Sequence, residues 1–569
     1  MLDLLWKHQL EKGYIGKSDI RAISRELEVS DTEVEGVISF YHFFHQQPTG
    51  HHTIYLNKSI LSEMAGSNEI REAIEKETGA KPGSVDDTGS FGFFDTSCIG
   101  MSDMEPAALI DFYPATHLTP DKIKKIITGL KQRKPIQELV SPVTNHVRKH
   151  LGDHSVFFQN YERGAIMKKF VNILPDEIIE ELKWSGLSGR GGAFFPTGLK
   201  WQLCKNAFSK RKYIICNADE GEPGTFKDRL LLSEKTGLLI EGMALAAFTV
   251  KAYEGIIYLR AEYRYMLPRI EQELEAFRKE GLLGENILGI PDFHFDIKVQ
   301  LGAGAYVCGE ETALIESLEG KRGEPRTKTF FPVEKGYLYK PTIVNNVETF
   351  CAAARIMEMG APAFKAMGTE KSSGAKLLSV SGDCEKPGIY EIEWGLTVND
   401  LLKLCGAKDA QFVQMSGPSG RLLVPEEYDL PISREGVMCG GSVMIFNQTR
   451  NILDVMINFN QFFIDESCGL CTPCRAGNYQ VGLLLDKIRK GKYTSDQAES
   501  LKEWAWLIRN TSRCGLGKSS NNFILDVIEK FPDLLKPTES SDTNGYRAFN
   551  IEESLIDYSD FVQKISDHG

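Results

Sequence analysis

The sequence predicts a multidomain α/β protein that ends in a helical region. Its 569 residues exceed what one hydrophobic core usually supports. Apolar, strand-like runs alternate with helical periodicity through the middle of the chain, and from about residue 456 the periodicity is only helical. We therefore expect three to five domains, with α/β layers before a helical bundle.

The first 140 residues predict a helical bundle followed by a compact α/β module. Residues 1–50 have helical periodicity, with helix starts at Ser18 and Asp31. Strand-like runs (HTIYLNK, FGFFDTSCIG and AALIDFY) then alternate with a helix over about 68–78. The module is predicted over 51–140, and the Lys- and Pro-bearing stretch 128–143 is predicted to be its linker.

Three further regions follow the linker. Over 150–370, apolar strands such as YIICNA, GIIYLRA and FDIKVQ alternate with helices such as LIEGMALAAFTVKAY, which predicts a parallel or mixed sheet with helices outside. Over 371–455, short strands with Gly and Pro turns predict a small mixed β module. Residues 456–569 are predicted to be helical.

Composition excludes several classes of function. The formal charge of -12 without a long basic run argues against a nucleic-acid partner. The most apolar run, LLIEGMALAAFTV, is too short to span a bilayer and carries Glu241. The first residues lack the pattern of a secretory signal, so we expect a cytoplasmic protein without a membrane span.

Four of the twelve cysteines have the spacing of a metal site. Cys468, Cys471 and Cys474 are each separated by two residues, and Cys514 follows at a distance. A close trio plus one remote cysteine is typical of a 4Fe-4S cluster. Structural zinc is the alternative, although zinc favours paired CxxC knuckles. The other eight cysteines are expected to be buried thiols.

A glycine-rich turn at 186–201 is the first part of a candidate nucleotide site. Gly189, Gly191 and Gly192 leave backbone amides accessible, and Arg190 and Lys200 add positive charge. Such a turn suits a phosphate. The neighbouring Phe194 and Phe195 offer flat surfaces for a ring, or alternatively belong to the core.

Two further segments join this candidate site. Polar residues follow the strand YIIC, where open α/β sheets bind ligands; they are Asn217, Asp219, Glu220 and Glu222. The segment 301–320 then runs through Gly302, Gly304 and Gly309 to a helix start with Glu310 and Glu311. Its glycines lack the G-x-G-x-x-G spacing, and the two acids could simply cap the helix.

These segments, with KPTIVNNVET at 340–349 and the cysteine trio, resemble the NADH-oxidising flavoprotein subunit of respiratory complex I and its soluble relatives over about 150–530. The resemblance implies a Rossmann-like FMN/NADH domain, a β-grasp domain and a helical 4Fe-4S domain. It implies that FMN contacts Gly189, Arg190, Gly191, Gly192, Lys200, Asn217, Asp219, Gly309, Glu310, Asn345, Asn346 and Thr349. NADH would lie among Phe195, Glu222, Glu311, Lys328 and Phe331, and we add Glu220 and Tyr306 as candidate cofactor-binding residues. Phe194 stands where the family pattern has glycine.

The amino-terminal region is similar to the thioredoxin-like subunit that carries a 2Fe-2S cluster in complex I. That family uses an early cysteine pair and a later Cys-x3-Cys, whereas this segment has only Cys98, with Ser102 at the second late position. One thiolate cannot hold a cluster that needs four ligands. The resemblance therefore implies a clusterless scaffold.

A fused, clusterless module of this kind looks most like the diaphorase subunit of soluble NAD-reducing NiFe hydrogenases. This implies hydride transfer between nicotinamide and FMN, then single-electron steps to the 4Fe-4S cluster. The expected partners are an iron-sulfur electron-transfer subunit and, through it, hydrogenase subunits. The alternatives are an NADH dehydrogenase or NAD-dependent formate dehydrogenase subunit with the same chemistry, and a nucleotide-binding or structural subunit with a zinc knuckle.

Overall fold

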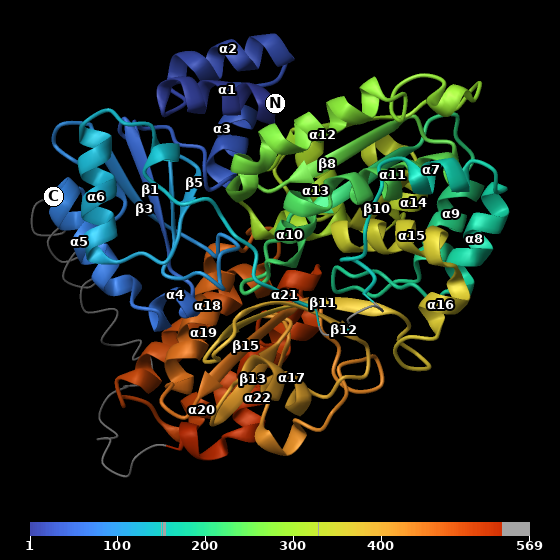
Figure 1. Ribbon diagram of the computed structural model, residues 1–569. Helices are drawn as coiled ribbons and strands as arrows, with labels where there is room; N and C mark the ends of the chain where they lie inside the picture. Colours follow the sequence, from blue (N-terminus) through green and yellow to red (C-terminus); the bar gives the residue numbers. More distant parts are fainter. Residues whose placement is uncertain (150, 152–154, 328, 537–569) are drawn as a thin grey trace, which may run out of the picture.

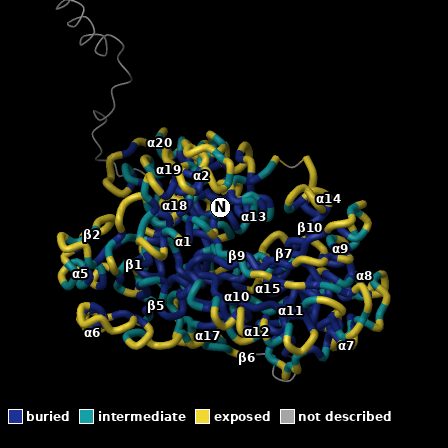
Figure 2. Tube along the Cα trace, turned by 90° about the horizontal axis from the view of Figure 1, so that it is seen from above, coloured by how far each residue is buried: buried dark blue, intermediate teal, exposed yellow. Residues whose placement is uncertain are grey.

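The structure is a computed structural model that describes residues 1–149, 151, 155–327 and 329–536. Its helices surround three sheets of five, four and six strands (Figure 1). Buried residues run through the interior of each part, and exposed residues lie at the rim (Figure 2). The predicted α/β multidomain architecture with a helical carboxyl-terminal region is confirmed.

Three short helices lie at the amino terminus: α1 (Leu2–Lys12), α2 (Lys17–Leu27) and α3 (Asp31–Phe40). Ser30 caps the start of α3: its hydroxyl accepts a hydrogen bond from the Glu33 amide at 3.2 Å, and the Glu33 carboxylate accepts one from the Ser30 amide, which is a capping box. In α1, the Trp6 indole donates to the Gly302 carbonyl at 2.9 Å. The bundle is therefore attached to the central α/β region rather than free of it.

The five-stranded sheet has the order β2-β3-β1-β4-β5. β1 pairs with β3 in parallel and with β4 antiparallel. Helices α5 and α6 contact each other, and the stretch predicted as a linker begins inside α6. The elements are β1 (His52–Asn57), α4 (Ile60–Met64), α5 (Ser67–Thr78), β2 (Ser84–Val85), β3 (Phe91–Thr96), β4 (Ala108–Ile110), β5 (Tyr113–Ala115) and α6 (Pro120–Lys131).

The four-stranded sheet is fully parallel, with the order β10-β7-β8-β9. Its strands are β7 (Tyr213–Ala218), β8 (Glu254–Leu259), β9 (Asp296–Leu301) and β10 (Thr342–Asn346). Its main helices are α7 (Ala165–Phe170), α8 (Pro175–Trp184), α9 (Thr197–Asn206), α10 (Lys227–Glu234), α11 (Thr236–Val250), α12 (Leu267–Lys279), α13 (Glu311–Leu318), α14 (Pro332–Lys335) and α15 (Val347–Met359).

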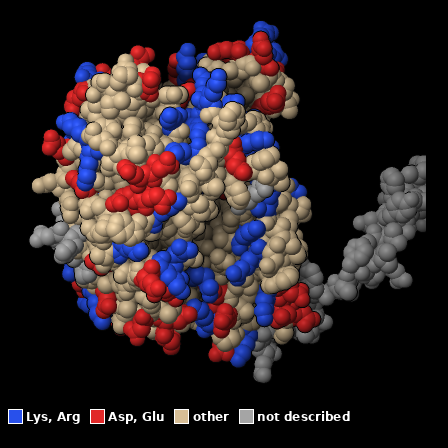
Figure 3. Space-filling model, turned by 90° about the vertical axis from the view of Figure 1, so that its right-hand side faces the viewer, with Lys and Arg blue, Asp and Glu red and all other residues tan. Residues whose placement is uncertain are grey.

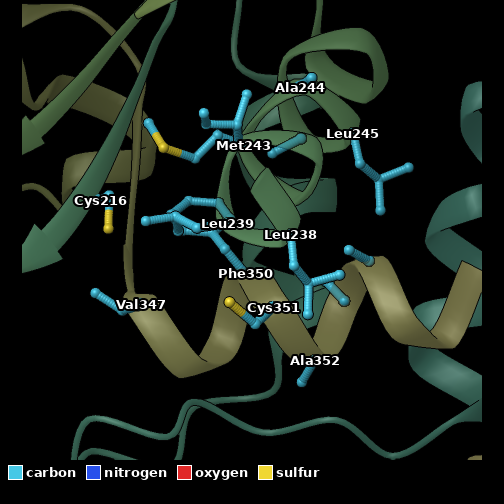
Figure 4. Packing of buried hydrophobic residues seen from close by; sticks show 14 of the residues in the cluster. Cys216, Leu238, Leu239, Met243, Ala244, Leu245, Val347, Phe350, Cys351 and Ala352 are labelled. Carbon is cyan, nitrogen blue, oxygen red and sulfur yellow. The ribbon is translucent and has the colours of Figure 1, made fainter. Parts of the chain in front are cut away.

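Helices α11 and α15 form the centre of the largest core (Figure 4). Leu239 and Met243 of α11 and Phe350 of α15 are fully buried beside Cys216 of β7. A Cβ at Gly242 would lie 2.2 Å from the Phe350 carbonyl oxygen, so the two backbones approach as closely as only glycine permits. This apolar packing fixes the helices behind the sheet and leaves the carboxyl ends of its strands available for a site.

The six-stranded sheet has the order β14-β13-β15-β11-β12-β6. Its last strand, β6 (Val147–Lys149), lies parallel to β12 and comes from the segment just before residue 150, where the sequence predicted no strand. The other elements are α16 (Ala361–Lys365), β11 (Ala375–Gly382), β12 (Gly388–Glu393), α17 (Val398–Cys405), β13 (Ala410–Met415), β14 (Arg421–Leu423) and β15 (Ser442–Asn447).

Five α-helices and a final short 3-10 helix (Pro532–Leu535) complete the described chain; the α-helices are α18 (Ile452–Asp465), α19 (Thr472–Arg489), α20 (Ser495–Thr511), α21 (Gly515–Ser519) and α22 (Asn522–Lys530). Residues 537–569 of the predicted helical region lie outside the described residues. None of the helices in the described ranges is long and apolar enough to cross a membrane. On the face shown in Figure 3, cationic and anionic side chains are interspersed rather than gathered by sign.

One fully buried ion pair joins the five-stranded module to the parallel-sheet region. Arg229 of α10 donates to both carboxylate oxygens of Asp103, each at 3.0 Å, and to the Gly100 carbonyl at 2.7 Å. Neither side chain of the pair is exposed. Because a buried charge without its partner is strongly destabilising, this contact holds the two modules in one arrangement.

We predict that Asp103→Ala lowers the free energy of unfolding by about 3–5 kcal/mol, because it leaves the Arg229 guanidinium buried without its carboxylate. The measurement is the thermal unfolding midpoint under fixed conditions. The control Lys408→Ala removes an exposed partner of Glu385 and should leave the midpoint almost unchanged, because solvent screens such a pair. Equal midpoints for the two variants would contradict a joining role for Asp103.

Candidate flavin and iron-sulfur site

A cavity of about 780 Å³ lies between the carboxyl ends of the parallel strands, the six-stranded module and the carboxyl-terminal helices. Its wall includes segments that are more than 300 residues apart in the sequence. Ten of the predicted cofactor-binding residues line it: Gly191, Gly192, Asn217, Asp219, Glu220, Glu222, Tyr306, Gly309, Glu310 and Asn346. The sequence-predicted segments therefore do meet at one site.

The glycine-rich turn presents backbone to the cavity. Gly192 has φ +104°, a conformation that side chains other than glycine rarely adopt. A Cβ at Gly191 would lie 3.2 Å from the Cβ of Asn346. The Arg190 amide donates to the Thr349 hydroxyl at 2.9 Å, which anchors the turn to α15. The turn is thus a fixed cradle with room for a bound group.

Behind this turn lies a buried cation. Arg190 is fully buried, and its Nη2 donates to the Ser373 carbonyl at 3.0 Å. Among the described residues its Nε has no hydrogen-bond partner. Burial lowers the pKa of the guanidinium to about 10, so it is still charged at neutral pH. A buried positive charge next to bare backbone amides fits the phosphate of FMN.

Polar groups at the strand ends are held in place by hydrogen bonds. Asn217 donates from Nδ2 to the Gly309 carbonyl at 2.8 Å and accepts from the Asp219 amide at 3.1 Å. Asp219 Oδ2 has no hydrogen-bond partner among the described residues, and burial raises the pKa of its carboxyl well above the usual range. This orphaned oxygen in the cavity wall fits a hydrogen-bonding ligand such as a flavin or its ribityl chain.

Two carboxyl groups of the wall, that of the buried Glu220 and that of the half-buried Glu222, have pKa values near neutrality. Burial raises the pKa of Glu222 to about 7. Hydrogen bonds from the Tyr306 hydroxyl and, at 2.9 Å, from the Ser419 amide stabilise the carboxylate and oppose this rise. Burial also raises the pKa of Glu220 to about 7. Its carboxylate accepts from the amides of Asp228 at 2.7 Å and Arg229 at 3.1 Å. The site therefore holds protonatable groups whose charge changes within the physiological range.

The other predicted residues that the structure describes are not part of the cavity wall. Asn345 accepts from the Trp201 indole at 3.0 Å, and Lys200 pairs with Glu311 at 3.1 Å. Phe195 and Phe331 are 40% and 61% exposed. Lys328 lies outside the described residues. Eight predicted residues are described by the structure but do not line the cavity: Gly189, Arg190, Phe195, Lys200, Glu311, Phe331, Asn345 and Thr349.

The adjacent Phe194 and Phe195 have different surroundings. Phe194 is 7% exposed and belongs to the core of the six-stranded module, so the core alternative holds for this ring. The Lys200 ammonium lies 6.0 Å from the centre of the Phe195 ring. Phe195, Lys200 and Glu311 thus form a half-exposed group that can receive a flat, polar ligand.

Sequence reasoning missed several residues of the wall. Lys227 and Asp228 line the cavity, although both are almost fully buried, and pair at 2.6 Å. The six-stranded module contributes Ser416, Ser419 and Gly440. Lys227 and Asp228 stand at the start of the apolar helix α10, and charged residues in such a position were a local signal for a functional role. The module's contribution depends on tertiary packing and has no local signal.

The four predicted cysteine ligands share one environment. Cys471 immediately precedes α19, Cys514 immediately precedes α21, and Cys474 lies in the first turn of α19. Burial raises the pKa of the Cys474 thiol to about 12, and the neighbouring Cys468, Cys471 and Cys514 contribute to this rise. Asn478 donates to the Cys474 sulfur at 3.6 Å. No three His, Cys, Asp or Glu side chains in the described part of the chain converge as a single metal ion requires.

These thiols fit an iron-sulfur cluster by their donor chemistry. Burial, with a smaller contribution from the neighbouring cysteines, raises the pKa of the Cys468, Cys474 and Cys514 thiols. Small residues surround the group. A Cβ at Gly517 would lie 3.2 Å from the Cβ of Cys474, so glycine keeps the chain close beside that ligand. Negative thiolates at helix starts are also favoured by the helix dipole.

Comparison with known proteins agrees with this geometry. Residues 182–355 match the family model described as "Nuo51 FMN-binding domain". Residues 454–537 match "NADH-ubiquinone oxidoreductase-F iron-sulfur binding region", and residues 1–131 match "Thioredoxin-like [2Fe-2S] ferredoxin". The chain is 46% identical over 550 residues to the NAD-reducing hydrogenase HoxS subunit alpha of Cupriavidus necator, covering 94% of this chain and 91% of that protein.

The chain belongs to the family of NAD-reducing hydrogenase alpha subunits. It is also 42% identical to an NADH-quinone oxidoreductase subunit of Aquifex aeolicus, over 64% of this chain and 87% of that protein. A solved NAD+-reducing [NiFe]-hydrogenase in the air-oxidised state contains a chain with TM-score 0.88 and 36% identity, covering 97% of this chain and 96% of that one. The family uses FMN, NAD(H) and a 4Fe-4S cluster, which supports the cluster over zinc.

The amino-terminal match covers a segment with one cysteine. Cys98 is buried, and its sulfur lies 3.4 Å from the Ser102 hydroxyl. Arg260 donates to the Cys98 carbonyl at 2.7 Å. The clusterless character of this module stays a prediction, as do the domain boundaries.

We predict that the apoprotein loses stability as pH rises from about 4.5 to about 7, because the folded state binds the Glu222 proton more tightly than the unfolded state does. The pKa rises from its ordinary value of 4.5 to about 7, which corresponds to about 3 kcal/mol lost across that window. Glu222→Gln should reduce the slope of this part of the profile without abolishing it, because burial also raises the pKa of Glu220 to about 7. The measurement is chemical unfolding of the FMN-free chain at several pH values.

The matched control for this prediction is Glu11→Gln, at an exposed carboxylate of α1. It should keep the wild-type dependence on pH. An unchanged slope in Glu222→Gln would mean that folding does not raise the pKa of Glu222, which would contradict the prediction.

Proposed function

We propose that this chain is the diaphorase subunit of an NAD-reducing hydrogenase, which transfers electrons between NAD(H) and an iron-sulfur chain through FMN. One observation carries the proposal: Gly515 and Leu516, which directly follow Cys514, line the same cavity as Gly191 and Asn217. A flavin in this cavity and a cluster on Cys514 would therefore be neighbours, as electron transfer requires.

We assign the cavity of about 780 Å³ to FMN. The amides of Gly191 and Gly192 and the charge of Arg190 suit its phosphate, while Asn217 and Asp219 offer hydrogen bonds to its polar groups. Gly309, Glu310 and Asn346 also line the cavity. Gly189, Lys200, Asn345 and Thr349 act from behind it, Lys200 by donating to the Val344 carbonyl at 3.0 Å.

We assign the half-exposed group beside the cavity to NAD(H). Phe195 and Phe331 offer apolar faces for a base, and Glu311 can accept hydrogen bonds from ribose hydroxyls. The resemblance also implies Lys328 as an NADH-binding residue, although it lies outside the described residues. Glu222, which the resemblance implies at the NADH adenine and ribose, is joined to Tyr306 by a hydrogen bond, and both line the cavity. Acidic groups here disfavour the additional 2'-phosphate of NADP.

Bound FMN supplies the conversion between two-electron hydride transfer and one-electron traffic. The side chains described here bind and orient, because hydride transfer itself needs no general acid or base. Glu222 and Glu220 can each hold a proton near neutral pH, so the site can balance a change of charge without moving its backbone. Cys468, Cys471, Cys474 and Cys514 are assigned to the 4Fe-4S cluster.

The partner that fits this role is an iron-sulfur electron-transfer subunit, and through it the NiFe hydrogenase subunits. The match with the hydrogenase subunit includes 94% of this chain and therefore reaches the amino-terminal modules. The match with the NADH-quinone oxidoreductase subunit includes only 64% of this chain. The amino-terminal module would then be a scaffold without its own cluster, and the complex would be cytoplasmic.

The decisive experiment is anaerobic purification of the chain with its natural partners, followed by flavin, iron and sulfide analysis and an assay of hydrogen-dependent NAD+ reduction. We expect one FMN and one 4Fe-4S cluster assigned to this chain, and hydrogen-driven NADH formation. The same cofactors with only NADH-to-dye activity in an intact complex would replace the hydrogenase with another electron donor. Zinc without flavin would refute the redox proposal.

We predict that Cys514→Ala removes most iron and sulfide from this chain but retains FMN and NADH oxidation by a flavin-reactive dye. Hydrogen-dependent NAD+ reduction should be lost, because the path out of the flavin is broken. The control Cys98→Ser, at a buried thiol of the amino-terminal module, should keep the cofactor content and both activities. Loss of iron in Cys98→Ser would overturn the clusterless assignment.

A further inference from the structure

Phe194 has an unusual backbone conformation for a large side chain. It has φ +53°, in the left-handed region where bulky residues are outliers and glycine is the usual choice. It is also part of the glycine-rich turn and lines the cavity. A strained aromatic residue in a cofactor turn needs surrounding contacts that hold it there.

Those contacts come from the six-stranded module. The Phe194 ring packs edge-on against Trp394, with ring centres 6.0 Å apart and planes at 65°, a favourable aromatic geometry. Trp394 is 3% exposed and directly follows β12. Burial of both rings offsets the strain, so the turn and the module are held together through this pair.

The same indole receives the buried cation of the turn. The Arg190 guanidinium lies 5.3 Å from the Trp394 ring centre, within the range of a cation–π contact. Arg190 also donates to the Ser373 carbonyl at 3.0 Å, just before β11. Trp394 therefore contacts both ends of the turn that carries Gly191 and Gly192.

We propose that Phe194 is a positioning residue that clamps the flavin-phosphate turn onto the six-stranded module through Trp394 and thereby slows the release of FMN. The proposal rests on the assignment of the cavity to FMN. Phe194 is part of the cavity wall but acts mainly through Trp394, which also contacts Arg190 and fixes the turn before the cofactor binds. Preorganisation of this kind increases affinity by lowering the ordering cost.

The test uses the full-length chain, freed of flavin and titrated with FMN by quenching of flavin fluorescence. Phe194→Gly removes the clamp but suits the left-handed backbone, so the protein should fold. We expect its FMN dissociation constant to rise about tenfold, mainly through faster release. Phe194→Tyr keeps the ring and should stay within about twofold of the wild type.

A double-mutant cycle tests the route through Trp394. Trp394→Leu should also raise the dissociation constant, and the double variant Phe194→Gly/Trp394→Leu should bind little worse than either single variant. Leu401→Ala is the matched control, because Leu401 is fully buried in the same core but does not line the cavity. It should destabilise the module and leave FMN affinity unchanged.

Four outcomes would overturn the clamp: unchanged or tighter FMN binding in Phe194→Gly, additive effects in the cycle, weak binding by Phe194→Tyr, or an equal loss in Leu401→Ala. If Phe194→Gly fails to fold, Trp394→Leu gives the same decision, since unchanged binding there refutes the clamp. Wild-type protein that binds no FMN would instead refute the proposed function, so the two failures are distinguishable.

Discussion

The arrangement of the molecule depends on one carboxylate, that of Glu220, which lies against the start of α10. It accepts the amides of Asp228 and Arg229 and, at 2.7 Å, the hydroxyl of Tyr263. These bonds fix the first turn of α10, which carries the three consecutive charged residues Lys227, Asp228 and Arg229. A carboxylate at a helix start satisfies otherwise unpaired amides and is favoured by the helix dipole.

Each of these three residues reaches a different part of the chain. Lys227 pairs with Glu348 at 3.0 Å, and Glu348 pairs with Lys376 of β11 at 2.5 Å. Asp228 accepts from the Asn346 side-chain amide at 2.6 Å, and Arg229 pairs with Asp103. Burial of so many charges is tolerated only because each is paired. The cavity lies where these contacts converge, which is why its wall belongs to several modules.

Much of this organisation could be predicted from the sequence because its signals are local. The apolar runs that became β7, β8 and β9, the capped start of α13 at Glu310, and the cysteine spacing each depend on a few neighbouring residues. The resemblance to known flavoproteins then grouped distant segments, ten residues of which line one cavity.

The rest could not be predicted because it depends on tertiary contacts. β6 has only three residues, which is too short for a local strand signal, and it forms a strand by pairing with β12. Lys227 and Arg229 resemble solvated helix-start charges until their partners at Glu348 and Asp103 are placed. The fate of Phe194 likewise depends on Trp394, 200 positions later in the chain, with which it packs.

The composite wall of the cavity has a consequence for biogenesis. Because segments from Gly191 to Asn522 form it, the pocket is complete only after most of the polypeptide has been synthesised and packed. A ligand that binds only the folded state stabilises it in proportion to the logarithm of its free concentration. Flavin supply would thus set how long newly made chains survive proteolysis, and vitamin limitation would lower the cellular amount of this protein before it lowered the turnover of finished copies.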